Sequence, residues 1–186
     1  MEKLIVLDRD GVINEDSDDY IKSPEEYIPI PGSLEAISKL NKAGYTVAVA
    51  TNQSGLARGY FSQETLDQMH DKLTTLLSQA GGKIDRIYVC PHGPDDHCDC
   101  RKPRPGLLLQ ILADYDAKSG QVIAIGDSLR DLQAARAVNM VPVLVRTGKG
   151  TNTEASLANN KNAEQFADVK IFDNLSQAVD AILSND

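Results

Sequence analysis

Two aspartates separated by one residue, Asp8 and Asp10, follow a short apolar run near the start of the chain and precede Gly11. A carboxylate can attack phosphorus, hold a divalent cation, or move a proton as a general acid and base. The pair therefore predicts nucleophilic and acid–base chemistry at this turn. An acidic turn without chemistry is the alternative, and this motif alone leaves both open.

Further polar groups follow or precede other apolar runs. The segment Thr51-Asn52-Gln53-Ser54 offers hydroxyls and amides that suit phosphoryl oxygens. Lys102 stands in a basic run that prolines stiffen, and Asp127 and Asp131 follow a later apolar run, one helical turn apart. Taken singly, these segments also fit a polar turn, a solvated basic loop and a helix cap.

The apolar runs predict the strands that must position these groups, and helical periodicity fills the segments between them. We expect strands over Leu4–Leu7, Tyr45–Ala50, Ile84–Val89, Val122–Ile125 and Val141–Val145, with a weaker pattern over Val169–Phe172. We expect helices over Ser33–Lys42, from an N-cap at Ser62 to Gly81, from Pro105, over Ser128–Val138, and from an N-cap at Asn174.

This alternation predicts an α/β fold in which one Rossmann-like parallel sheet carries helices on both faces. Such sheets bind ligands beyond the carboxyl ends of their strands, where the candidate groups stand. A length of 186 residues fits one domain, 1–186. We expect the polar stretch Thr147–Gln165 to be a loop and His70 to be a polar residue on a helix surface.

Composition excludes several classes of protein. Twenty-seven acidic against nineteen basic residues give a net charge of −8, which argues against nucleic acid as a partner. No segment has the roughly 18 consecutive apolar residues of a membrane span, and the N-terminus is too short and charged for a signal peptide. We expect a cytoplasmic protein that contacts no membrane. No long apolar stripe remains after the core helices, so we expect a monomer.

Three cysteines and a histidine form a compact pattern, Cys90-x-His92-x5-Cys98-x-Cys100. Four nitrogen and sulfur ligands at such spacing are typical of tetrahedral Zn²⁺ in a structural site that leaves no position for water. Three unrelated buried cysteines are the alternative, and His97 is a competing ligand. The zinc-binding loop would span residues 90–102 and lead directly into Lys102.

The order D-x-D, Thr, Lys, Gly-Asp along the chain resembles the haloacid dehalogenase (HAD) superfamily of phosphatases, over roughly Leu4 to Val145. The resemblance implies that Asp8 attacks phosphorus to give an aspartyl-phosphate and that Asp10 serves as general acid and base. It implies that Asp8, Asp127 and the backbone carbonyl of Asp10 hold Mg²⁺.

The same resemblance assigns supporting roles. Lys102, Thr51 and the N–H of Asn52 would bind the phosphoryl group, with Asp131 supporting them from behind. Members of the superfamily often carry a cap domain after the first or second motif. About thirty residues separate Asn14 from the second strand, and about fifty separate Asn52 from Lys102. Neither segment has room for a cap, so loops must shape the specificity.

Two zinc-containing families without a cap share D-R-D-G and C-P-H…C-D-C-R-K-P: the D-glycero-D-manno-heptose 1,7-bisphosphate 7-phosphatases and the histidinol-phosphate phosphatases. The segment T-N-Q-S-G-L-A-R-G, residues 51–59, resembles the heptose family. The histidinol family tends to have Asp in place of Ser54 and lacks A-R-G. The resemblance implies a Mg²⁺-dependent enzyme that removes the C7 phosphate and leaves heptose 1-phosphate. The anomer stays open.

Histidinol phosphate or another small phosphomonoester is the alternative substrate. A non-catalytic zinc-stabilised binding module is disfavoured because every catalytic position is filled. A nucleic-acid-end phosphatase is disfavoured by the net charge of −8 and the lack of a basic groove.

A sugar bisphosphate needs cations for its second phosphate, and Arg suits phosphate through its planar donor fork. Arg58, Arg101 and Arg104 are available, and Arg101 with Lys102 matches the pair that contacts substrate in the heptose family. Gln53 and Ser54 are candidates for the sugar hydroxyls.

The loop around Asp16 and Tyr20 would cover the sugar. Two features depart from the family pattern: Ser128 replaces a frequent Lys, and the loop Glu15–Asp19 is longer and more acidic.

Overall fold

The computed structural model of the chain describes residues 3–159 and 164–185. Its centre is a six-stranded sheet in the order β3-β2-β1-β4-β5-β6, and every neighbouring pair runs parallel. The strands are β1 (Lys3–Leu7), β2 (Tyr45–Asn52), β3 (Arg86–Cys90), β4 (Ile123–Gly126), β5 (Val141–Val145) and β6 (Lys170–Phe172). The helices are α1 (Ser33–Lys42), α2 (Gln63–Gln79), α3 (Gly106–Asp114), α4 (Leu129–Ala137), α5 (Gly150–Asn159) and α6 (Leu175–Leu183), with a short 3-10 turn at Ser119–Gln121.

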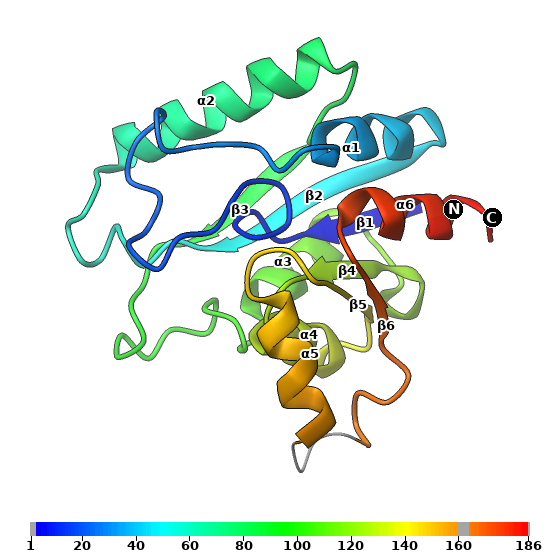
Figure 1. The fold of residues 1–186 in the computed structure, drawn as a ribbon. Coiled ribbons are helices and arrows are strands. Elements are labelled where there is room, and N and C mark those ends of the chain that lie inside the picture. Colours follow the sequence, from blue (N-terminus) through cyan, green and yellow to red (C-terminus); the bar gives the residue numbers. More distant parts are fainter. Residues whose placement is uncertain (1–2, 160–163, 186) are drawn as a thin grey trace.

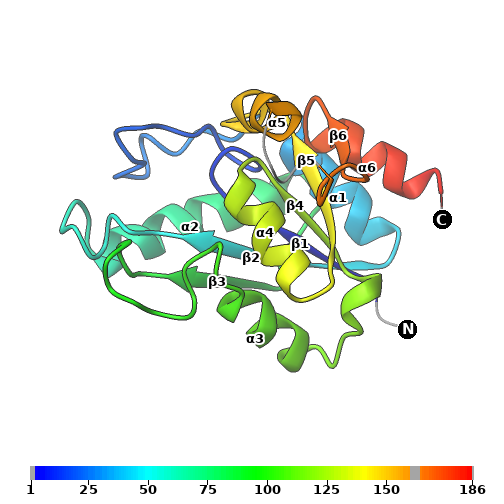
Figure 2. The same cartoon turned by 90° about the horizontal axis from the view of Figure 1, so that it is seen from below.

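Helices cover both faces of the sheet because its strands are apolar on both faces. In β1, Ile5 and Leu7 belong to the apolar cluster that the helices α1, α2 and α6 complete. Leu4 and Val6 belong to the opposite cluster, which α3 and α4 complete. Figure 1 shows α1, α2 and α6 above the sheet and the other three helices below it, and Figure 2 shows α3 and α4 from their own side. The predicted α/β fold is confirmed.

All six predicted strands and all five predicted helices are present. Ser62 and Asn174 cap their helices as expected, since their side chains accept hydrogen bonds from the backbone N–H groups of Thr65 and Gln177. The second strand extends two residues further than predicted because Asn52 still pairs with Cys90 of β3. Thr51 therefore lies within a strand and not after it.

The prediction of a loop over Thr147–Gln165 is wrong for Gly150–Asn159, which forms α5; residues 160–163 lie outside the described residues. The apolar signal of this helix is weak, since only Leu157 joins the buried cluster of Leu132, Leu144 and Phe166. A tertiary contact adds to it: the Thr153 hydroxyl donates to the backbone carbonyl of Asp127 at 2.8 Å. Periodicity in one segment cannot reveal an acceptor supplied by another.

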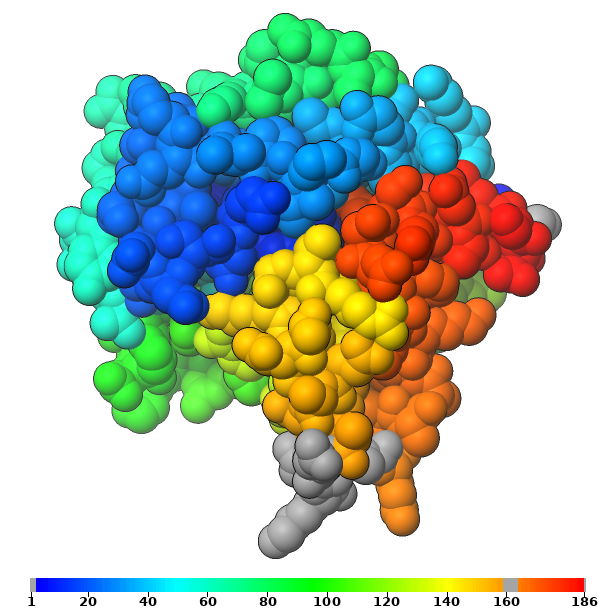
Figure 3. Space-filling model, in the orientation of Figure 1, coloured from blue at the N-terminus to red at the C-terminus, as the bar shows by residue number. Residues whose placement is uncertain are grey.

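The side on which strands are added to the sheet changes between β1 and β4: β2 and β3 follow on one side of β1, and β4, β5 and β6 follow on the other. Ligands of such sheets bind at this switch point. The segment after β1 meets the segment after β5 there, as the blue and yellow surfaces of Figure 3 show, and the Thr147 hydroxyl donates to the Gly11 carbonyl at 2.6 Å. Between β1 and α1 the chain forms turns and isolated bridges. Within the described ranges, no helix is both long and apolar enough to cross a membrane.

The packing of α2 on the sheet gives a stability prediction. Leu73 of α2 is fully buried in the larger cluster, so Leu73→Ala removes contacts and leaves a cavity. We expect it to lower the free energy of unfolding by about 2–5 kcal/mol in urea titrations. Leu109→Ala, at a leucine that is 53% exposed on α3, is the matched control and costs under about 1 kcal/mol. Equal losses would contradict this assignment of the core.

Candidate active site

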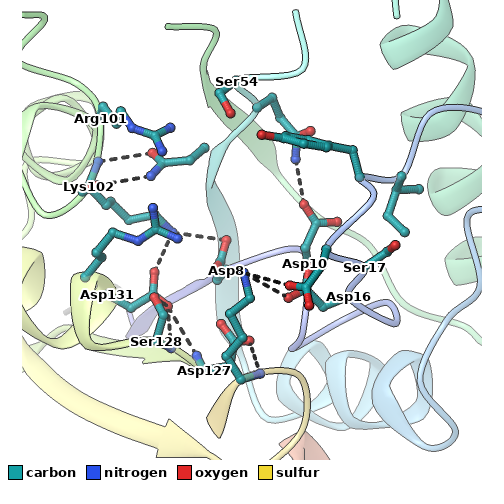
Figure 4. A pocket seen from close by; sticks show the side chains of 17 residues that line it. Asp8, Asp10, Asp16, Ser17, Ser54, Arg101, Lys102, Asp127, Ser128 and Asp131 are labelled. Carbon is teal, nitrogen blue, oxygen red and sulfur yellow. Dashed lines mark hydrogen bonds and ion pairs between the residues drawn. The ribbon is translucent and has the colours of Figure 1, made fainter. Parts of the chain in front are cut away.

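The buried side chain of Lys102 connects three segments at the carboxyl edge of the sheet. Its Nζ lies 3.0 Å from Asp8 Oδ1 and 2.7 Å from Asp131 Oδ1, and it donates to the Ala50 carbonyl at 2.8 Å (Figure 4). The Asn52 side chain holds the Lys102 backbone from both sides, through its carbonyl oxygen and its amide, each at 3.1 Å. The predicted phosphate-binding residue Asn52 thus also positions the lysine.

The charges around Lys102 do not balance. Burial opposes the charge of Lys102, but Asp131 and Asp8 outweigh it and raise the lysine pKa. Burial raises the pKa of Asp8 well above its usual value, and Asp131 adds to this. Burial and Asp131 likewise raise the pKa of Asp127 to about 7. Carboxylate oxygens of Asp8, Asp127 and Asp131 all lie within 4.8 Å of one another, which leaves the cluster with excess negative charge.

Two glycines make room for Asp127. A Cβ on Gly11 would lie 2.1 Å from Asp127 Oδ2, and one on Gly148 would lie 2.2 Å from it. Both glycines also have positive φ, at 81° and 57°, where side chains are strained. The Lys149 backbone N–H donates to the same oxygen at 2.8 Å.

Asp131 serves both as a helix cap and as part of the site. Its Oδ2 accepts from the Ser128 hydroxyl at 2.7 Å and from the Ser128 backbone N–H at 3.0 Å, within the capping box of α4. Its Oδ1 is held by Lys102. The two roles that the sequence offered for Asp131 are therefore compatible.

The two oxygens of Asp10 have different surroundings. Oδ1 accepts three hydrogen bonds, from Arg9 Nε at 3.0 Å, Arg9 Nη2 at 2.8 Å and Asn14 Nδ2 at 2.8 Å. Among the residues that the structure describes, Oδ2 accepts only from Gln53 Nε2, at 2.9 Å. Burial opposes ionisation of Asp10, but Arg9 and these hydrogen bonds outweigh it and lower the pKa. Oδ2 keeps the lone pair that can exchange a proton.

A cavity of about 280 Å³ opens above these groups. The predicted residues that line it are Asp8, Asp10, Asp16, Tyr20, Asn52, Gln53, Ser54, Arg101, Lys102 and Asp127. Thr51 is not among the lining residues; it is buried, and its Oγ1 accepts from Gln53 Nε2 at 2.9 Å. Arg58 is not among them either, since its guanidinium lies over the Tyr20 ring, 5.9 Å from the centroid.

Arg130, which the sequence analysis missed, lines the cavity beside Arg101. Burial and repulsion from Arg130 lower the pKa of Arg101. Within the described residues neither guanidinium has an ion pair with a carboxylate. The sequence position of Arg130 could have indicated its place in the site, because Arg130 lies in the first turn of α4, directly before the candidate residue Asp131. Ser128, the position at which the resemblance implied a lysine, also lines the cavity.

The loop at 90–102 gathers the four predicted zinc ligands. Ligand atoms of Cys90, His92, Cys98 and Cys100 lie within 4.8 Å of one another. The sulfur atoms of Cys90 and Cys98 are 3.8 Å apart, the spacing of about 3.8 Å that tetrahedral ligands of Zn²⁺ adopt. Cys90 and Cys100 are closer, at 2.9 Å. The competing candidate His97 is not part of this cluster.

The expectation that His70 is a surface residue is wrong. His70 is half-buried on α2, and its Nε2 lies 3.1 Å from Nη1 of the fully buried Arg9. Burial and the Arg9 charge lower the pKa of His70 to about 4. The sequence could not show this contact, because most neighbours of His70 on α2 are polar and its partner lies 61 positions earlier in the chain.

Comparisons with known proteins agree with this geometry. A family model described as HAD-hydrolase-like matches residues 99–178. A D-glycero-β-D-manno-heptose-1,7-bisphosphate 7-phosphatase from Pseudomonas aeruginosa is 59% identical over 150 residues, which cover 81% of this chain and 84% of that protein.

Two solved structures extend the likeness to the whole fold. The D,D-heptose 1,7-bisphosphate phosphatase from B. bronchiseptica, complexed with magnesium and phosphate, is 49% identical, has a TM-score of 0.93, and covers 99% of both chains. The corresponding phosphatase from Burkholderia thailandensis is 39% identical, with a TM-score of 0.76 and coverage of 98% of this chain and 99% of that one. With the carboxylate cluster in place, this identity shows that the chain is a phosphoric monoester hydrolase of the D-glycero-β-D-manno-heptose-1,7-bisphosphate 7-phosphatase family.

Proposed function

We propose that the chain hydrolyses the C7 phosphate ester of D-glycero-β-D-manno-heptose 1,7-bisphosphate to heptose 1-phosphate and inorganic phosphate. The observation that carries this is one cavity lined both by Asp8, Asp10 and Lys102 and by two arginines, Arg101 and Arg130, that have no ion pair with a carboxylate among the described residues. A substrate with two phosphates can use both sets of groups. The name of the relative from Pseudomonas aeruginosa specifies the β anomer.

Histidinol phosphate fits this cavity less well. It carries one phosphate and a cationic amine, and a cation placed near Arg101 and Arg130 would be repelled. The second phosphate of the sugar bisphosphate instead meets two donor forks without carboxylate partners in the described chain. Arg58 and Arg104 lie outside the cavity lining, so we assign the distal phosphate to Arg101 and Arg130. Arg58 acts indirectly, by packing over Tyr20.

Hydrogen bonds distinguish the attacking oxygen of Asp8. Oδ1 accepts from the Arg9 backbone N–H at 2.8 Å and contacts Lys102 at 3.0 Å, which leaves Oδ2 to attack phosphorus. As the bond from Oδ2 to phosphorus forms, the bond from phosphorus to the sugar oxygen breaks. Asp10, whose pKa Arg9 lowers in the free site, takes up a proton when the anionic phosphoryl group binds beside it and gives this proton to the sugar oxygen. Asp10 then takes a proton from water, whose oxygen displaces Asp8 and releases phosphate.

The carboxylate cluster fits a magnesium ion, because Lys102 is shared between Asp8 and Asp131, no ion pair holds Asp127 among the described residues, and the pKa values of Asp8 and Asp127 stay raised. Oxygen ligands of this kind suit a hard cation. Asp8, Asp127 and the backbone carbonyl of Asp10 would hold Mg²⁺, whose charge would offset the negative charge that develops on the phosphoryl oxygens. Asp131 already accepts from Lys102 and Ser128, so it supports the site without binding the ion.

We assign the cluster of Cys90, His92, Cys98 and Cys100 to structural Zn²⁺. Four ligands in a tetrahedral set leave no position for water, so the ion would take no part in the reaction. The loop continues into Arg101 and Lys102, and ordering it would fix the segment from which both cations project. We further infer that the chain acts as one catalytic domain in which the loop at 15–20 covers the sugar in place of a cap.

Phosphate release in the presence of Mg²⁺ tests the proposed substrate. We expect the β anomer of heptose 1,7-bisphosphate to exceed histidinol phosphate in kcat/KM by about 100-fold or more, since the latter leaves Arg101 and Arg130 unpaired. The α anomer is measured alongside. Asp8→Asn is the control for a contaminating phosphatase: it abolishes turnover and keeps the melting temperature. Preference for histidinol phosphate would overturn the substrate while leaving the mechanism.

The raised pKa of Asp127 predicts that Asp127→Asn increases the stability of the fold, and that the increase depends on pH. The folded pKa of about 7 lies above the unfolded value of about 3.9, so the folded state holds the extra proton at low pH. The stability this provides is full below about pH 4 and is lost as pH rises through 7. In Mg²⁺-free buffer we expect the variant to exceed wild type by about 1–3 kcal/mol at pH 8, and by little at pH 5.

Urea unfolding at both pH values measures this difference. Adding Mg²⁺ stabilises the wild type and leaves the Asp127→Asn variant unchanged, since the variant lacks one of the proposed ligands. A variant less stable than wild type at pH 8 without Mg²⁺ would show that Asp127 is not strained by its neighbours.

The proposed zinc site predicts that Cys98→Ser lowers metal content and stability together. Loss of one of four ligands weakens binding, and folding free energy is lost with it. Zinc per chain is measured by atomic emission, and the melting temperature is expected to fall by several degrees. His97→Ala, which removes the histidine outside the cluster, is the control and keeps full zinc. Stoichiometric zinc in Cys98→Ser would exclude this ligand set.

A further inference from the structure

Arg9 lies between the two aspartates of the first motif, and its side chain is fully buried. One end of the guanidinium, Nε and Nη2, donates to Asp10 Oδ1. The face of the guanidinium lies against the ring of Tyr27, 5.5 Å from its centroid. Nη1 lies 3.1 Å from His70 Nε2. All three nitrogen atoms of the guanidinium and one of its faces therefore have a defined partner.

The contact with His70 defines the state of the histidine. A guanidinium offers only donors and keeps its charge, so Nε2 of His70 must accept with its lone pair. The ring is then the neutral tautomer with its proton on Nδ1. The lowered pKa of His70, caused first by burial and then by Arg9, agrees with this state at neutral pH.

We propose that His70 is a positioning residue for proton transfer at Asp10 and that it acts through Arg9. This inference rests on the proposed function, in which Asp10 is the general acid and base. His70 accepts from Nη1, and no other acceptor for that nitrogen is found among the described residues. Without it, a buried charged donor would be left unsatisfied, at considerable cost.

The consequence for Asp10 follows from the rigid shape of the guanidinium. The three nitrogen atoms of the planar guanidinium move together. If Nη1 turned toward water or another acceptor, Nε and Nη2 would therefore move away from Asp10 Oδ1. Oδ1 would then have one donor, from Asn14, and Oδ2 one donor, from Gln53. The difference that assigns the proton to Oδ2 would disappear. Asp10 would no longer give and take the proton at one fixed atom.

The helix that supplies His70 also holds the segment after β1. Lys72 of α2 donates from Nζ to the carbonyls of Pro24 and Tyr27, at 2.6 and 2.8 Å. Lys72 is two positions from His70 on the same helix, and in the described structure it reaches Arg9 only indirectly, through Tyr27, whose ring packs on the guanidinium. Lys72→Met therefore loosens the docking of the segment without removing the acceptor, which makes it a matched control.

The test compares wild type with His70→Phe, His70→Gln and Lys72→Met. Activity is measured with Mg²⁺ on heptose 1,7-bisphosphate, whose sugar alkoxide is a poor leaving group and therefore needs a proton from Asp10. We expect His70→Phe to lower kcat by about 10–100-fold, because Asp10 is misplaced, while KM stays within about twofold. In His70→Gln, the side-chain carbonyl can accept from Arg9, so kcat is expected to recover to within about threefold of wild type. Lys72→Met keeps kcat within about threefold.

A second substrate separates the two proton transfers. The leaving group of p-nitrophenyl phosphate departs as a stable anion, so formation of the aspartyl-phosphate needs little help from an acid. Its hydrolysis still needs Asp10 as a base. In His70→Phe we expect a rapid burst of p-nitrophenolate, stoichiometric with active sites, followed by slow turnover. A merely structural defect would lower the burst itself.

Several results would overturn the inference. One is a kcat of His70→Phe equal to wild type. Another is a Lys72→Met loss as large as that of His70→Phe with no recovery in His70→Gln, which would indicate general loosening of α2. If His70→Phe does not fold, His70→Leu takes its place.

The same assays distinguish failure of the proposed substrate from failure of the proposed role of His70. Wild type that is slow on heptose bisphosphate yet active on p-nitrophenyl phosphate would overturn the substrate only, and the burst would still decide the role of His70. Wild type inactive on both substrates would overturn both proposals.

Discussion

The ammonium group of Lys102 contacts Asp8 after β1, Asp131 in α4 and the backbone of β2 at Ala50. These segments are far apart in sequence, and their carboxyl ends meet only because the strands are parallel and adjacent. A buried lysine with two carboxylates and a carbonyl has no unsatisfied donor, which is the condition under which a buried charge is tolerated. The position of Asp8, the proposed nucleophile, therefore depends on a contact that forms only when the strands of the sheet are assembled.

The charges of the site remain unequal despite this contact. A single ammonium faces Asp8, Asp127 and Asp131, and the first two keep raised pKa values. The imbalance costs stability in the isolated chain, and it is also what creates affinity for a cation. Asp10 lies only a few residues from Asp8 but is balanced by Arg9, so its pKa moves in the opposite direction. Two neighbouring carboxylates thus acquire different chemistry from their partners and not from their own nature.

Much of this arrangement could be predicted from the sequence, because strand ends are marked by abrupt changes from apolar to polar residues. Helices α1 and α2 are predicted nearly to the residue, because α1 lies between Gly32 and Gly44 and α2 has strong periodicity and the cap Ser62. The helix α5 was missed since its stability includes the bond from Thr153 to the Asp127 carbonyl. His70 and Arg130 were missed for a related reason: their partners, Arg9 and Arg101, belong to other segments. Arg58 was assigned to the cavity by its motif, yet it stacks on Tyr20 instead. Local pattern predicts where a residue stands in an element, whereas its partner is a property of the assembled fold.

Gly11 and Gly148 meet across Asp127 with no space for even one carbon atom on either. A substitution at one glycine cannot be relieved at the other, because neither has a side chain left to shorten. Neither glycine in this wall of the site can therefore be replaced by a larger residue without displacing Asp127. The cavity residues Tyr20, Arg101 and Arg130 are partly or largely exposed, so substitutions there meet no such steric limit and are the ones expected to change substrate preference. The chemistry and the specificity of the enzyme are thus free to diverge at different rates.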